Sequence, residues 1–69
     1  MDTTDYEIRV ERHLSSTIAA LFPELTLKDE EGSTVMRGAL PDQAALHGVL
    51  ARIRDLNLTL ISITRLDER

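Results

Sequence analysis

The chain has 69 residues, a net charge of −4, twelve acidic against eight basic residues, and no cysteine. A chain this short buries only roughly 60% of the surface that its unfolded form exposes, which leaves no room for a deep catalytic cleft. Without cysteine there are no disulfides and no thiolate metal ligands. The basic residues are scattered rather than clustered, which disfavours nucleic acid as a partner.

The sequence predicts neither a targeting segment nor a membrane segment. Residues 1–5 are acidic and polar, unlike the positively charged start of a signal peptide. No apolar run approaches the ~20 residues of a membrane span. We therefore expect a cytoplasmic protein without membrane contact, formed as a single domain over residues 1–69 with residues 1–5 as a disordered tail.

The first half predicts a strand followed by a helix. Residues 6–11 (YEIRVE) alternate apolar and charged side chains, which is the period of a strand with one buried face. The next apolar residues recur at helical spacing: Leu14, Ile18, Leu21 and Phe22. Ser15 or Ser16 can cap this segment and Pro23 ends it, which predicts a helix of about two turns.

A hairpin is predicted next. Residues 25–28 and 34–40 form its two strands, and the polar connection 29–33 contains Gly32 at a turn position. The acidic residues 29–31 lack the spaced oxygen ligands of a calcium loop, so an acidic turn is the better interpretation.

The second half predicts a longer helix and a last strand. Asp42 is the expected N-cap of the helix, and Asn57 is a suitable left-handed terminator. One apolar stripe runs along the helix through Leu46, Val49, Leu50, Ile53 and Leu56. Its charged residues Arg52, Arg54 and Asp55 are interpreted as a solvated face. Residues 59–65 are rich in β-branched side chains and form the fourth strand.

This order, β-α-β-β-α-β, predicts an α+β, ferredoxin-like two-layer sandwich. Four antiparallel strands form the sheet, both helices cover one of its faces, and strands 6–11 and 34–40 lie in its centre. The side chains expected to face the helices are Tyr6, Ile8, Val10, Met36, Gly38, Leu40, Ile61 and Ile63. Those expected on the open face are Glu7, Arg9, Glu11, Thr26, Lys28, Val35, Arg37, Leu60, Ser62 and Thr64.

The open face is therefore expected to be wet and of mixed charge. The two aromatic residues, Tyr6 and Phe22, are needed in the core, so base stacking on this face is not expected. Its charges disfavour an apolar face-to-face dimer, but they permit a polar dimer paired through Glu7, Arg9, Glu11 and Arg37. The edge strand 59–65 is open to β-augmentation.

Gly48 and His47 lie within the predicted second helix, where a glycine and a histidine each need an explanation. Packing against Ala19 and Ala20 of the first helix would explain the glycine, and close approach of a ligand or partner is the alternative. His47 is expected at the edge of the apolar stripe. With His13 as the only other histidine and no Gly-x-Ser-x-Gly turn, the sequence predicts neither a metal centre nor a nucleophile.

Two segments, YEIRVERHL and PDQAALHGVLARIRDLNLTLISITRLD, resemble a family of short bacterial proteins with a DQAALHGLL…RDLGL.L.SV.RL ending. The similarity runs from Tyr6 to Asp67. It departs in the first helix, where the relatives carry tryptophan and this chain has residues 17–22 (TIAALF). The family has no established activity, so the resemblance implies no site residue.

The segment GVLARI is also similar to the Pro-Gly-Val-Leu-like turn of ACT domains. In that family the glycine ends a strand, whereas Gly48 lies within a predicted helix and follows a histidine rather than a proline.

These observations predict a small non-catalytic module for protein–protein interaction or homodimerisation, with no catalytic residue, cofactor or metal. The candidate interaction surface comprises Glu7, Arg9, Glu11, Arg37, Leu60, Ser62 and Thr64. The alternative is a regulatory domain, ACT-like in role, that holds a small ligand between the second helix and a neighbouring subunit near His47 and Gly48.

Overall fold

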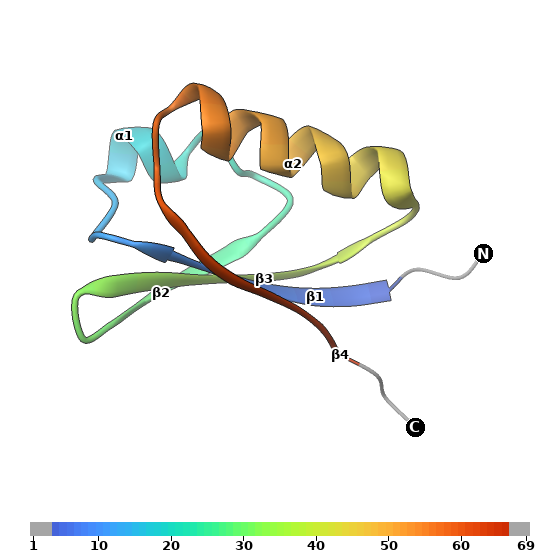
Figure 1. The fold of residues 1–69 in the computed structure, drawn as a ribbon, viewed down its shortest axis with the longest axis horizontal. Helices are drawn as coiled ribbons and strands as arrows, with labels where there is room; N and C mark the ends of the chain where they lie inside the picture. The colour runs from blue at the N-terminus through green and yellow to red at the C-terminus, as the bar shows by residue number, and fades with distance from the viewer. Residues whose placement is uncertain (1–3, 67–69) are drawn as a thin grey trace.

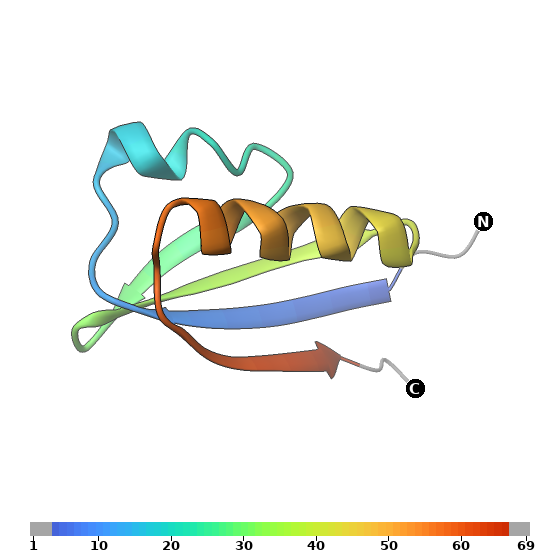
Figure 2. The same cartoon turned by 45° about the horizontal axis from the view of Figure 1, so that its top comes forward.

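A computed structural model describes residues 4–66 of the chain. The elements follow the order β1 (Thr4–Glu11), α1 (Ser16–Ala19), β2 (Thr26–Glu30), β3 (Ser33–Leu40), α2 (Gln43–Asp55) and β4 (Leu60–Leu66). The strands form one antiparallel sheet in the spatial order β2-β3-β1-β4. Both helices lie on the same side of this sheet (Figure 1, Figure 2). The predicted α+β class, with a four-stranded antiparallel sheet and two helices, is confirmed.

β1 is an inner strand, flanked by β3 and β4. As the alternating pattern predicts, one face of the strand is buried, with Tyr6, Ile8 and Val10 in the core. Thr4 and Asp5 are predicted to belong to a disordered tail, but they form the start of this strand. The remainder of that expected tail, residues 1–3, lies outside the described residues.

The β2–β3 hairpin is tighter than predicted. Asp29 and Glu30 extend β2, so the connection consists of Glu31 and Gly32 alone. Their φ angles are 48° and 87°, and two successive positive values define a type I′ turn. Such a turn has the same twist as the flanking strands, which lets pairing continue up to it.

α1 is a single turn rather than the predicted two. Ser15 caps it by accepting a hydrogen bond from the N–H of Ile18 at 3.2 Å. The chain leaves the helix at Ala20, so that Phe22 is 1% exposed in the core and Leu21 is 46% exposed. Of the predicted stripe, Leu21 alone faces solvent, because Phe22 enters the core from a turn and not from a helix face.

Arg52 of α2 links that helix to the segment between α1 and β2. Its guanidinium donates to the Leu21 carbonyl oxygen at 2.6 Å, pairs with the Glu24 carboxylate and lies 5.2 Å from the centroid of the Phe22 ring. The hydrogen bond from Arg52 lowers the pKa of Glu24. The interpretation of Arg52 as a solvated charge is wrong, because three groups of one segment converge on it.

α2 begins and ends as predicted. The Oδ1 atom of Asp42 accepts a hydrogen bond from the N–H of Ala45 at 2.9 Å, and Asn57 has the left-handed φ of 60°. Leu46, Val49 and Ile53 are buried against the sheet. Besides these three, the buried core cluster contains Tyr6, Ile8, Val10, Leu14, Phe22, Leu25, Met36 and Leu40.

Candidate interaction surfaces

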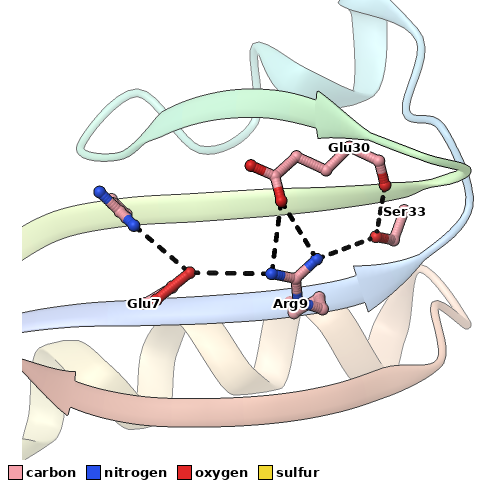
Figure 3. Close-up of polar contacts among 5 residues, drawn as sticks. Glu7, Arg9, Glu30 and Ser33 are labelled. Atoms are coloured by element: carbon pink, nitrogen blue, oxygen red, sulfur yellow. Dashed lines mark hydrogen bonds and ion pairs between the residues drawn. The ribbon is translucent and has the colours of Figure 1, made fainter.

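The open face of the sheet carries a network of charged side chains (Figure 3). The Arg9 guanidinium lies 3.4 Å from Glu30 Oε1 and donates to Ser33 Oγ at 3.3 Å. Glu7 Oε2 lies 3.5 Å from the Arg37 guanidinium and 4.0 Å from that of Arg9. Three of the four charged residues predicted to pair across a dimer therefore pair within one chain, while the fourth, Glu11, is exposed at the end of β1.

Val35 departs from the expectation of a wholly wet open face. It lies opposite Arg9 of β1 and Lys28 of β2, on the side away from the core, yet it is only 3% exposed. The aliphatic stems of such long side chains cover apolar surface while their charged ends stay in water. A hollow of about 200 Å³ adjoins Val35 and is also lined by Thr26, Lys28, Glu30 and Arg37.

Glu30 and Ser33 belong to this network, although neither is among the residues predicted for the interaction surface. The sequence predicts both residues within the polar connection 29–33, where side chains need no partner. Their signal is present in the alternation of β2: Thr26, Lys28 and Glu30 lie two residues apart, so a strand that continues to Glu30 places all three on one face. Placing Glu30 and Ser33 on this face requires a turn of two residues in place of the predicted connection 29–33.

β4 is the outer strand beside β1, and its side chains from Leu60 to Arg65 are exposed. Ile61 is 51% exposed and Ile63 is 37% exposed, although both were expected to face the helices in the core. The buried core of residues 4–66 contains no β4 side chain. The physical reason is that α2 buries its apolar stripe against the inner strands, so the outer strand has no helix above it (Figure 2).

A register shift in β4 overturns a second expectation. Arg9 pairs with Ser62 but Val10 pairs with Leu60, which leaves Ile61 as the extra residue of a β-bulge. Leu60 thus lies opposite a core residue instead of on the open face, and it is 42% exposed. Ser62 and Thr64 remain on the open side, opposite Arg9 and Glu7.

The two edges of the sheet differ in charge. β2 carries Lys28, Asp29 and Glu30 within five residues, and such charges on an edge discourage pairing with another strand. In β4 the run from Leu60 to Thr64 has no charge, and Arg65 is its charged residue. The structure therefore brings the predicted residues Leu60, Ser62 and Thr64 together on a partly apolar edge, which is interrupted by the bulge at Ile61 and followed by the charge of Arg65.

His47 and Gly48 lie on the exposed side of α2, away from the core. A Cβ atom added to Gly48 would meet nothing within 4 Å, so the predicted packing against Ala19 and Ala20 is wrong. The one-turn α1 is too short to cover this side. Nothing in the described residues tests the alternative ligand position, which stays a prediction. His13 Nδ1 lies 2.8 Å from Asp29 Oδ2, and both side chains are exposed.

Replacing Gly48 by alanine is expected to stabilise the protein. Glycine costs about 0.5–1 kcal/mol within a helix, and the new methyl group has free space. The melting temperature should rise by about 2–8 °C in a calorimetric scan. A lower melting temperature would show that a backbone contact requires the glycine.

Neither helix within residues 4–66 has the length and apolar composition needed to span a bilayer. The same residues contain no cluster of three or more His, Cys, Asp or Glu side chains suited to a metal ion.

The fold and these surfaces define a small α+β domain with an antiparallel sheet, one charged face and one partly apolar edge. The chain belongs to a family described as a domain of unknown function (DUF8691), whose model matches residues 5–64. Comparison with curated proteins and with solved structures finds no match.

Proposed function

We propose that this protein is a non-catalytic interaction module that binds a protein partner by adding a strand to its β4 edge. The observation that carries the proposal is the exposure of β4, where Leu60, Ile61 and Ile63 are 42%, 51% and 37% exposed along an uncharged run. Natural edge strands usually carry charges or a cover that prevent pairing. The stretch from Ser62 to Thr64 has neither, and it lies between the bulge at Ile61 and the charged Arg65. Such a stretch is suited to β-augmentation, in which main-chain hydrogen bonds supply affinity.

The ion pairs of the charged open face also favour the β4 edge as the binding surface. Glu7, Arg9, Arg37 and Glu30 already have partners within the chain, so a dimer through this face would first have to break these pairs. We therefore place the interaction at the edge and assign the network a structural role, covering Val35.

We also propose that the fold is the ferredoxin-like arrangement of two interleaved βαβ units. In the order β2-β3-β1-β4, β3 lies between β1 and β2, and β1 lies between β3 and β4. Each helix then connects two strands that have a third strand between them, which supports this assignment.

A site-specific cross-link tests the edge. Because the chain lacks cysteine, Ser62→Cys provides a single attachment point for a photoactivatable maleimide on β4, and Thr26→Cys provides the matched point on β2. In an extract of the source cells we expect adducts of defined mass from Ser62→Cys and not from Thr26→Cys. Adding Ile63→Lys should reduce them, since a charge then occupies the edge.

Two results would contradict the proposal. One is an equal yield of adducts from both edges, which would indicate non-specific encounter. The other is a yield from Ser62→Cys that Ile63→Lys leaves unchanged, since binding would then not depend on the apolar edge.

A further inference from the structure

We infer that the partner of the β4 edge is a second copy of this chain, paired antiparallel across a two-fold axis that brings Ile63 opposite itself. This inference rests on the proposed function and names the partner of the same edge. It would join the two sheets into one continuous sheet, with a β4 strand from each copy at the seam.

The backbone pattern selects the residues that face outward. Along a strand of an antiparallel sheet, the N–H and C=O groups of successive residues point alternately to the two neighbouring strands. Glu11 donates to the Thr59 carbonyl oxygen, so Glu11, Arg9 and Glu7 bond towards β4. Their partners Ser62 and Thr64 bond towards β1, and the backbone groups of Ile63 between them point to the open edge.

The side chains then match in kind. With Ile63 opposite Ile63 of the second copy, an apolar pair forms on the side of the sheet that carries the helices. Ser62 lies opposite Thr64 of the second copy, which gives a polar pair on the open side. Pairs of matched character across a ladder are favourable, and this register needs no unmatched charge at its centre.

The position of Arg65 distinguishes this register from its neighbour. Centred on Ile63, each Arg65 lies opposite Ile61, and the two arginines are separated by roughly 13 Å along the strands. Centred on Thr64, the two Arg65 residues become diagonal neighbours about 7–8 Å apart, a like-charge contact on one face. The separation of the two arginines therefore favours the register centred on Ile63 over the one centred on Thr64.

Interface size and charge predict how the dimer behaves. A seam of a few paired residues lies at the small end of interface areas, so association should be reversible and depend on concentration. Each copy carries a net charge of −4, while the run from Leu60 to Thr64 is uncharged. Added salt should therefore leave association unchanged or strengthen it, whereas it would weaken a dimer held by the charged open face.

Light scattering on the full chain tests the inference, over about two decades of protein concentration and at two salt levels. We expect the mass to rise from one chain to two with concentration. Ile63→Lys and Ile63→Glu should each raise the dissociation constant by about tenfold or more, because like charges then face each other across the axis. Mixing the two variants should restore the dimer, since lysine then lies opposite glutamate.

The matched control is Thr26→Lys, which adds a charge to the opposite edge and should leave the mass unchanged. Circular dichroism establishes that each variant is folded. A wild-type chain that stays monomeric at every concentration would overturn the inference, and the cross-link at Ser62→Cys would then decide separately whether the edge binds another protein. A dimer that Ile63→Lys does not weaken, or that the mixture does not restore, would also overturn it.

Discussion

Replacing Gly38 by alanine is expected to lower the free energy of unfolding by about 2–3 kcal/mol. Gly38 lies on the helix side of β3, opposite Tyr6, where the segment before β2 crosses close to the sheet. A Cβ atom at this position would lie 2.8 Å from the Glu24 carbonyl oxygen and 2.7 Å from Leu25 Cδ2. The leucine side chain can rotate away, but the carbonyl belongs to the backbone and cannot move without displacing its segment.

The displaced segment explains the size of this effect. Leu25 is 8% exposed in the core, and Glu24 is held by Arg52, so a shift here disturbs both the core and the link to α2. A chain of this length has a total stability of about 3–10 kcal/mol, of which the loss is a large fraction. The melting temperature should fall by at least about 8 °C in a calorimetric scan.

The matched control for Gly38→Ala is Gly48→Ala, which makes the same chemical change at a site with free space. The two variants should shift the melting temperature in opposite directions. An unchanged melting temperature for Gly38→Ala would contradict the close contact between Gly38 and the segment containing Glu24.

Replacing Thr34 by valine is expected to destabilise the protein by about 1–3 kcal/mol, although valine has nearly the same shape. Thr34 is 1% exposed. Its hydroxyl donates to the Arg12 carbonyl oxygen at 3.0 Å and accepts from the N–H of Leu14 at 3.4 Å. Valine would leave both backbone groups without this partner, and a buried polar group that loses its hydrogen bond is costly.

Thr34 also holds a strained backbone. Arg12 has a φ of 99°, which is unfavourable for a residue with a side chain, and it directly precedes the turn that brings Leu14 into the core. Hydrogen exchange should therefore show faster exchange at the Leu14 amide in Thr34→Val. Urea titration measures the loss of stability, with the exposed Thr26→Val as control. Equal unfolding midpoints for the two variants would refute the role of the hydroxyl.

Much of the candidate interaction edge was predictable from its residues. The uncharged run that includes Leu60, Ser62 and Thr64 distinguishes the last strand from the charged strand that ends at Glu30. The sequence did not reveal that Ile61 and Ile63 are exposed as well. A β-branched run has the same pattern whether a helix covers it or not, and the bulge at Ile61 comes from pairing with β1.

The sequence alone determined the features that depend on neighbouring residues. The alternation of residues 6–11 produced β1, Asp42 capped α2, and Asn57 and Gly32 took the left-handed conformations expected of them. These outcomes follow from local sterics and hydrogen bonding, which act over a few residues along the chain.

Only the tertiary structure decided which faces of these elements are buried by other parts of the chain. In the folded chain Arg52 contacts the segment around Phe22, and Val35 is buried on the open face. Gly48 has free space around it, and no helix lies above β4. The reason is physical. Periodicity shows which side chains share a face, but burial depends on what the rest of the chain places against that face, and one short and one longer helix are enough to cover only part of this sheet.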